Sequence, residues 1–351
     1  MDLPKYDGNI HPDEWINDLH TYFNIKQNQN LININLVISL VDSTIKLPTG
    51  IDNYERLRNA LKEDISFTVF KNTNKRRLQS LKYTPERKGG NTSLFISTFR
   101  KLCYNAEIND VEEQKRYLYK SLPNNHFDYI SNEFYEKMKN VNSTNELIKR
   151  FEEIILEESN LIRNGSIVAL KHVASGKYLS SINNLFYTTG SNYQLVFVGN
   201  SEPVPNSLWK IHFGEELVTY TDNSIMLQHI KSAGNFLGIC NSYYDNDWRY
   251  DHCKSPSTNH TEVSCYSDYL TRDWKFKHSK LENHQGYLKS NDIINLSIKK
   301  TYGNGGYDFL RSHDIQFTIE NDTFQEVVCH DERLGGNDEW CIELIHEVKI
   351  F

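Results

Sequence analysis

One short segment gathers aromatic, acidic and basic side chains that could bind a ligand. Residues 243–250 contain four aromatic rings, two carboxylates and one guanidinium. Aromatic faces make apolar contacts with sugar rings while carboxylates hydrogen-bond sugar hydroxyls, and the same groups suit a peptide. We therefore predict a glycan or protein ligand at this loop; the alternative is a long loop that only packs on its own domain. The predicted ligand-binding residues are Tyr243, Tyr244, Asp245, Asp247, Trp248 and Arg249.

Catalytic motifs are missing from the sequence. It contains neither the G-x-S-x-G pattern of a nucleophile elbow nor a glycine-rich phosphate loop. Acidic pairs such as Glu152-Glu153 and Glu215-Glu216 are adjacent in sequence, and solvation explains them better than acid–base catalysis, which needs two carboxylates in contrasting environments. We predict no catalytic residue, no cofactor and no enzyme activity.

The six cysteines are dispersed and include no C-x-x-C pair, which favours reduced, mostly buried thiols over disulfides or zinc. The alternative is a metal cluster around Cys253, which follows His252 and lies 12 residues from both Cys240 and Cys265. Zinc ligands usually come in closely spaced pairs, so we predict no metal site.

Charge and hydropathy exclude several classes of protein. Residues 1–164 carry 23 basic and 23 acidic side chains and residues 165–351 carry 16 and 23, so neither half has the positive surplus that nucleic-acid binding requires. The basic cluster between Lys71 and Lys82 is interpreted as a solvated helix end. Apolar runs such as Leu36 to Val41 are far shorter than the roughly 20 residues of a membrane span. The amino terminus lacks the pattern of a secretory signal, which predicts a cytoplasmic or nuclear protein.

The first half has helical periodicity. Trp15, Leu19, Tyr22 and Phe23 share one helix face, and further faces are predicted at Leu57, Leu61 and Ile65 and at Phe95, Phe99 and Leu102. Ser143 and Glu146 form a candidate capping box ahead of a helix that reaches Ile162. We predict an all-helical domain over residues 1–163, with a loop near 84–91 between two lobes.

The second half, residues 164–351, has short strands that recur in three copies. The copies close on Trp209, Trp274 and Trp340, which lie 65 and 66 residues apart. Three such units can close into one barrel in which each contributes a third of the core. The predicted structural residues of the repeat are Trp209, Trp274, Trp340, His172, His229, Leu179, Leu237 and Leu310.

The first copy resembles the MIR motif, named for protein mannosyltransferases, inositol-trisphosphate receptors and ryanodine receptors. The matching strings are GSIVALKHVASGKYLSS from Gly165, TTGSNYQLVFVG from Thr188, and Leu208 to Ile211. The resemblance covers residues 165 to 346 and is poorer in the third copy. It implies a β-trefoil, and it implies no catalytic residue because MIR modules are accessory parts of larger proteins.

The amino-terminal half resembles the Gag capsid region of gypsy-class retrotransposons. The motifs are PKYDGNIHPDEWINDLHTYF from Pro4, then Leu78-x-x-Leu81 with the aromatic series after Gly90, and Leu118-x-x-x-Leu122-Pro123, where Ser121 replaces the usual glycine. The match spans residues 4 to 160, and no zinc knuckle follows it. The resemblance implies a capsid-like fold that self-associates and a domesticated retroelement origin.

Together these features predict a two-domain protein, an all-α capsid-like domain followed by an all-β trefoil. We predict a binding and assembly protein, a homo-oligomer through residues 1–163 with a recognition surface on the trefoil. The alternative is a soluble accessory or enzyme of protein glycosylation. Nucleic-acid packaging is disfavoured by the charge distribution.

Overall fold

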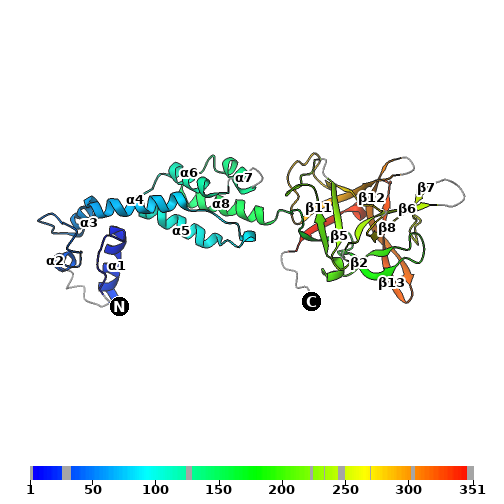
Figure 1. Ribbon diagram of the computed structural model, residues 1–351, viewed down its shortest axis with the longest axis horizontal. Helices are drawn as coiled ribbons and strands as arrows, with labels where there is room; N and C mark the ends of the chain where they lie inside the picture. The colour runs from blue at the N-terminus through cyan, green and yellow to red at the C-terminus, as the bar shows by residue number, and fades with distance from the viewer. Residues whose placement is uncertain are drawn as a thin grey trace. The chain divides into compact units, whose positions relative to one another are not determined.

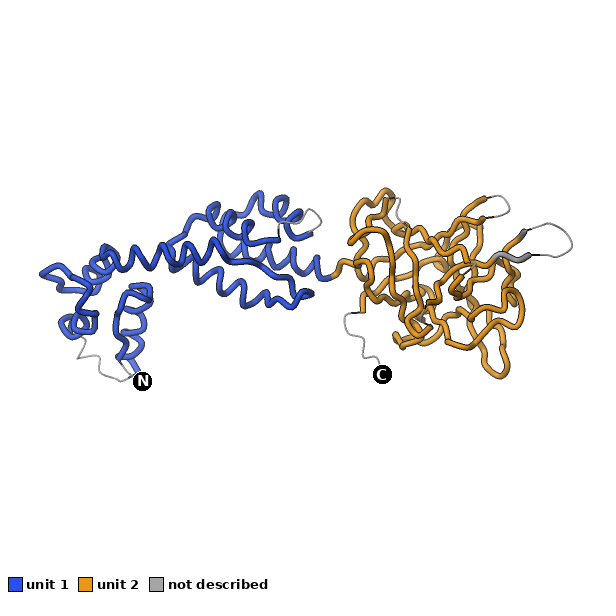
Figure 2. The backbone as a smooth tube through the Cα atoms, in the orientation of Figure 1, with its two compact units in different colours: residues 1–159 blue, residues 160–351 orange. Residues whose placement is uncertain are grey.

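The chain divides into two compact units, residues 1–159 and residues 160–351 (Figure 2). The computed structural model describes residues 3–25, 33–123, 129–221, 224–232, 234–243, 250–268, 270–301 and 305–345. The sequence predicts the division at 163/164, four residues later. The difference arises because Ile162 belongs to the second unit: its N–H donates to the Leu288 carbonyl oxygen at 3.0 Å and its side chain lies in the β core.

The first unit is helical (Figure 1). Side chains of Asn and Asp residues accept the first free N–H groups of several helices, for example Asn53 at Arg56 and Asp110 at Glu113. Among the described residues, no helix combines the length and apolar composition that crossing a membrane requires. The eight α-helices of the described residues are α1 (Pro12–Ile25), α2 (Ile34–Ile38), α3 (Tyr54–Glu63), α4 (Ile65–Ser80), α5 (Thr92–Asn105), α6 (Val111–Ser121), α7 (Tyr129–Lys137) and α8 (Thr144–Ser159).

The helix faces follow the sequence pattern with one exception. Trp15, Leu19 and Phe23 are buried on one face of α1, and Leu57 and Leu61 on α3 pack in the same cluster. Ile65 does not continue this face and is 72% exposed. The prediction was wrong here because α3 ends at Glu63 and a new helix starts after a break in the chain, which changes the direction of the following side chains.

The segment between α4 and α5 is tightly folded. It contains the 3₁₀ helix η2 (Glu86–Lys88) and ends on Gly89 and Gly90. A Cβ at Gly90 would lie 1.7 Å from the Thr84 carbonyl oxygen, so only glycine fits this close approach. At the start of α8, the Ser143 hydroxyl accepts the Glu146 N–H at 3.2 Å, while the Glu146 carboxylate accepts the N–H of the residue before Ser143.

The second unit is built from antiparallel strands. The fourteen strands of the described residues are β1 (Ile167–His172), β2 (Leu179–Phe186), β3 (Gln194–Val198), β4 (Trp209–His212), β5 (Ser224–His229), β6 (Phe236–Tyr243), β7 (Tyr250–His252), β8 (Thr261–Tyr266), β9 (Leu270–Thr271), β10 (Trp274–His278), β11 (Asp292–Lys299), β12 (Tyr307–Ile319), β13 (Asp322–His330) and β14 (Trp340–Leu344). Within the described chain, the pairings close a ring through β1, β4, β5, β10, β11 and β14. Three hairpins, β2–β3, β6–β8 and β12–β13, meet where β3, β8 and β13 pair with one another.

The three tryptophans of the repeat have equivalent surroundings. Each indole is fully buried in the same apolar cluster. Each Nε1–H donates at 3.0 Å to a backbone carbonyl oxygen of the hairpin of its own copy, and the three donor–acceptor pairs are Trp209 with Leu179, Trp274 with Leu237, and Trp340 with Leu310. The indoles therefore fill the barrel and attach the hairpins to it.

Candidate functional site

The aromatic and acidic loop predicted to bind a ligand lies almost entirely outside the described residues. Tyr243 is the last residue of β6, and Tyr244, Asp245, Asp247, Trp248 and Arg249 are not among the described residues. The flanking strands β6 and β7 pair antiparallel with residue 243 opposite residue 250, so they hold the two ends of the loop together. Ligand binding at the loop stays a prediction.

The two histidines of the repeat occupy matching places opposite core tryptophans. Nε2 of His172 and of His229 lies 3.0 and 3.1 Å from a carbonyl oxygen three residues before a core tryptophan. Because that oxygen can only accept, Nε2 carries the proton and Nδ1 accepts from the hydroxyls of Ser175 and Ser232, each at 2.9 Å. Burial lowers the pKa of both imidazoles. Both nitrogens are occupied, so these residues hold strand ends rather than exchange protons.

Two fully buried carboxylates also have structural partners. Glu262 accepts the hydroxyl and, at 3.2 Å, the N–H of Ser191. Glu326 accepts the Ser257 N–H at 2.9 Å and the Thr258 hydroxyl at 2.8 Å. Burial raises the pKa of Glu262 to about 7, against the opposing hydrogen bonds from Ser191. Each carboxylate anchors a turn that comes from the preceding copy of the repeat.

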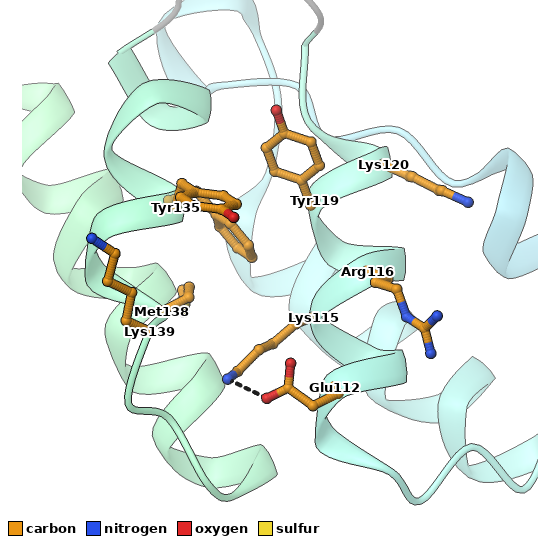
Figure 3. A pocket seen from close by; sticks show the side chains of 9 residues that line it. Glu112, Lys115, Arg116, Tyr119, Lys120, Tyr135, Met138 and Lys139 are labelled. Atoms are coloured by element: carbon orange, nitrogen blue, oxygen red, sulfur yellow. Dashed lines mark hydrogen bonds and ion pairs between the residues drawn. The ribbon is translucent and has the colours of Figure 1, made fainter.

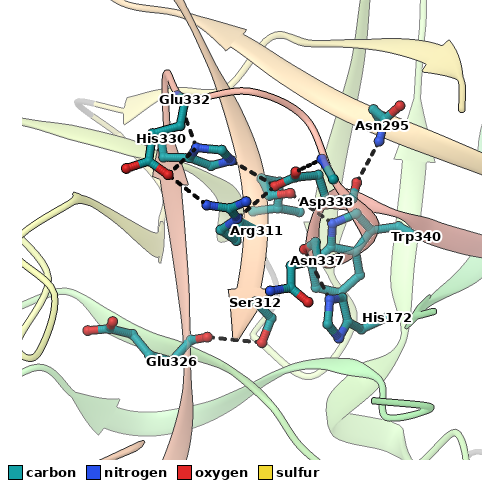
Figure 4. Close-up of polar contacts among 12 residues, drawn as sticks. His172, Asn295, Arg311, Ser312, Glu326, His330, Glu332, Asn337, Asp338 and Trp340 are labelled. Atoms are coloured by element: carbon teal, nitrogen blue, oxygen red, sulfur yellow. Dashed lines mark hydrogen bonds and ion pairs between the residues drawn. The ribbon is translucent and has the colours of Figure 1, made fainter. Parts of the chain in front are cut away.

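A buried ionic cluster lies near Trp340 (Figure 4). One oxygen of Asp338 is 2.7 Å from His330 Nε2 and 3.0 Å from Arg311 Nε, and the other accepts the Gly335 N–H at 2.6 Å. Burial acts to raise the pKa of Asp338, but these hydrogen bonds and the guanidinium outweigh it and the pKa is lowered. The aspartate–histidine pair has the composition of a catalytic dyad. However, His330 Nδ1 already accepts the Glu332 N–H at 3.1 Å, so the imidazole cannot act as a base.

The outer face of β10, β11 and β12 carries a different set of side chains. On β10, Trp274 and Phe276 point into the core and are buried, so the alternate residues Lys275 and Lys277 project outward. The register places Lys275 opposite Ser297, and Ser297 opposite Phe309. Cross-strand neighbours on one face lie within contact distance, so this row forms a continuous surface.

Three adjoining hollows follow this surface, and we call them the β10–β12 groove. The central hollow has about 300 Å³ and is lined by Tyr220, Lys275, Phe276, Lys277, Ser297, Tyr307 and Phe309. A hollow of about 400 Å³ shares Tyr220 and Lys277 with it, and one of about 530 Å³ shares Lys275 and Tyr307. The groove therefore combines aromatic rings with cationic and hydroxyl side chains.

Tyr220 is held rigidly in the wall of the groove. Its hydroxyl donates to the Asp292 carboxylate at 2.7 Å, and its ring meets the Phe276 ring edge-on at 5.0 Å and the His284 ring at 4.7 Å. Burial, together with the Asp292 carboxylate, raises the pKa of Tyr220 well above its ordinary value. A ring fixed in this way loses little conformational entropy when a ligand packs against it.

The groove has a positive bias in a half of the chain that is acidic overall. Lys275, Lys277, Lys299 and Lys300 line it, with Asp273 and Glu282 as the acidic lining residues. Lys300 forms an ion pair with the buried Asp308 at 2.9 Å. This site is not evident in the sequence, because its residues come from segments up to 89 positions apart, from Tyr220 to Phe309. The alternation of tryptophan, lysine, phenylalanine and lysine from residue 274 was the available signal.

The basic cluster on α4 and the six cysteines were the other candidate sites in the sequence. Two lysines of the basic cluster on α4, Lys71 and Lys75, form ion pairs with Glu107 and Glu113 at 3.1 and 3.4 Å. The six cysteines, all within the described residues, form no disulfide; five are buried, and burial raises the pKa of Cys103 to about 12. Over the described ranges, no group of three or more metal-ligating side chains is assembled.

Comparisons with known proteins give distant structural likenesses. No protein-family model and no curated protein matches the chain. The SDF2-like protein from Arabidopsis thaliana is 24% identical, covering 52% of this chain and 94% of that one with a TM-score of 0.41. The Saccharomyces cerevisiae protein O-mannosyltransferase Pmt1-Pmt2 complex is 18% identical over 72% of this chain and 31% of that one, also with a TM-score of 0.41. Function does not follow from likenesses of this size.

Proposed function

We propose that the chain is a non-catalytic binding protein whose β unit is a MIR-like β-trefoil that recognises a glycan carrying negative charge. The observation that carries the proposal is the β10–β12 groove, where rings of Tyr220, Tyr307 and Phe309 lie beside two outward-facing lysines. Aromatic faces suit the apolar side of sugar rings, and the ammonium groups suit sulfate, phosphate or carboxylate substituents. The ring of six strands and the three equivalent tryptophans support the trefoil assignment.

The proposal of a non-catalytic protein rests on the state of the buried ionisable groups. The imidazoles of His172, His229 and His330 use both nitrogens in structural hydrogen bonds. Glu262 and Asp338 likewise accept from neighbouring turns. An acid–base mechanism needs a group that can reach the substrate and exchange its proton.

Substitutions in the groove test glycan recognition. Tyr307→Ala and Lys275→Ala should each weaken binding of a sulfated oligosaccharide by about tenfold or more, because each removes a contact worth about 1.5 kcal/mol. Isothermal titration calorimetry with matched sulfated and unsulfated oligosaccharides measures the effect. Lys231→Ala, at an exposed position outside the groove, is the control. Equal binding of wild type and both groove variants, or turnover of a sugar donor by the wild type, would contradict the proposal.

We further propose that the helical unit self-associates, as a capsid-like domain would. Large apolar side chains more than half exposed concentrate on this unit among the described residues. They are Ile25, Ile65, Val69, Leu94, Tyr135 and Leu156, against Leu281 alone on the β unit. Ile65 and Val69 are four residues apart on α4 and share one face. An exposed apolar helix face such as that of Ile65 and Val69 is a feature of association surfaces.

Light scattering during size-exclusion chromatography tests self-association. The wild-type mass should rise above the 41.1 kDa of one chain as concentration increases. Replacing Ile65 and Val69 together by serine should return the mass toward that of one chain, because the apolar face is lost. Leu281→Ser, on the β unit, should leave the mass unchanged. A wild type that stays at the mass of one chain at every concentration would remove the proposal.

A further inference from the structure

The helical unit contains an apolar hollow that lies apart from the β10–β12 groove and shares only Tyr135 with the exposed apolar residues named for self-association. It lies between α6 and the region of α7 and has about 450 Å³ (Figure 3). Phe134 and Met138 are buried beneath it, while the rings of Tyr119 and Tyr135 are 46% and 72% exposed at its sides. A hollow of this size accepts one large apolar side chain.

Helical spacing brings the lining residues to one opening. Lys115 and Tyr119 are four residues apart on α6, and Tyr135 and Met138 are three apart at the end of α7. The Tyr119 and Phe134 rings lie 5.6 Å apart and join the two helices below the opening. The walls are therefore attached to packed helices, so a ligand would meet a preformed surface.

The rim of the hollow is basic. Lys115, Arg116, Lys120 and Lys139 line it, with Glu112 as the one acidic lining residue. Figure 3 shows Lys115 and Lys139 on opposite sides of the hollow. Residues 1–164 are balanced in charge overall, so this bias is local. The helix dipole favours a cation in the last turn of α6, which explains Lys120 but not the other three.

Two of the rim cations already have carboxylate neighbours. Lys115 is 2.7 Å from Glu112, and Lys139 is 2.7 Å from Glu136. The Lys139–Glu136 pair is exposed, and exposed pairs contribute at most about 1 kcal/mol, whereas the Lys115 side chain is only 11% exposed. A carboxylate supplied by a ligand can therefore replace the Lys139 contact at little cost, and Arg116 and Lys120 lie exposed beside it.

We propose that this hollow docks an acidic peptide segment of a partner protein, which inserts one apolar side chain between Tyr119 and Tyr135. The apolar anchor covers Phe134 and Met138, and carboxylates beside the anchor pair with the basic rim. This division matches peptide recognition in general, where a buried aromatic or aliphatic anchor supplies affinity and charge complementarity supplies selectivity. The site belongs to the helical unit and does not depend on the glycan proposal.

The test uses the full chain and three labelled dodecapeptides. The first is rich in glutamate with one central tryptophan, the second has serine in place of that tryptophan, and the third has lysine in place of every glutamate. Fluorescence polarisation should detect binding of the first peptide and at least tenfold weaker binding of the other two. Raising the salt concentration should weaken the first interaction, since three of the rim cations, Arg116, Lys120 and Lys139, are exposed.

Variants at exposed positions separate the site from general effects on folding. Tyr135→Ala and Lys139→Glu should each weaken binding of the first peptide at least tenfold, with circular dichroism unchanged. Lys149→Glu, at an exposed position on α8, is the matched charge control and should bind as the wild type does. Equal binding of acidic and basic peptides, no binding up to about 1 mM, or a Lys139→Glu variant that changes only the oligomeric state would overturn the proposal.

Discussion

Replacing Trp274 by alanine should destabilise the β unit by about 3–5 kcal/mol, the range observed when a buried Trp or Phe is truncated. The indole is fully buried, so its loss opens a cavity in the barrel and leaves the Leu237 carbonyl oxygen without its donor at 3.0 Å. Because domains are stable by only about 5–15 kcal/mol, this is a large fraction of the total. Urea unfolding followed by circular dichroism measures the change, and hydrogen exchange assigns it to residues 160–351.

Three comparisons sharpen this prediction. Trp274→Phe keeps most of the volume and removes the N–H, so it should cost less than alanine. Trp209→Ala and Trp340→Ala should cost about as much as Trp274→Ala, because each indole makes the same hydrogen bond in the same cluster. Trp15→Ala should instead destabilise the helical unit, where its indole donates to the Pro4 carbonyl oxygen at 3.1 Å. Clearly unequal costs at the three barrel positions would contradict a threefold structure.

Glu262→Gln should change the pH dependence of stability. The pKa of Glu262 is about 7 in the folded chain, against an ordinary value of 4.5, so between these values the folded state binds more protons than the unfolded state. The contribution of this group to the free energy of unfolding is therefore present below pH 4.5 and falls as the pH rises to about 7. A shift of that size corresponds to about 3 kcal/mol. The glutamine side chain does not titrate. Between pH 4 and pH 8 the free energy of unfolding of the variant should therefore rise by about that amount relative to the wild type.

The informative quantity is the difference between the free energies of unfolding of the variant and the wild type at each pH. His172 and His229 have lowered pKa values, so their contributions rise with pH and partly mask that of Glu262 in the wild-type profile. Both histidines are present in the variant, and their effect cancels in the difference. Glu202→Gln, at an exposed position, is the control and should give a flat difference. A flat difference for Glu262→Gln as well would show that this carboxyl does not titrate abnormally.

Where the sequence prediction departs from the structure, the missing information is either a local break between helices or the backbone pairing of distant segments. Ile65 was assigned to the face of Leu57 and Leu61 because the apolar spacing continues, yet a one-residue break at Asp64 starts a new helix. Leu161 and Ile162 were assigned to the last helix on the same basis. In the structure the Leu161 backbone pairs with Lys289, which lies more than a hundred residues later. Periodicity does not reveal such long-range backbone pairing.

The sequence by itself determined the order of the two units and the threefold repeat, with its tryptophans and the histidines at strand ends. These features are local, since a 3.6-residue or two-residue period and recurring indoles can be read along the chain. Only the tertiary structure decided which outward side chains lie together. The β10–β12 groove joins Tyr220, Lys275 and Tyr307, and the hollow near α7 joins Lys115 and Tyr135. Both depend on strand register and helix packing, which arise from contacts between segments far apart in the chain.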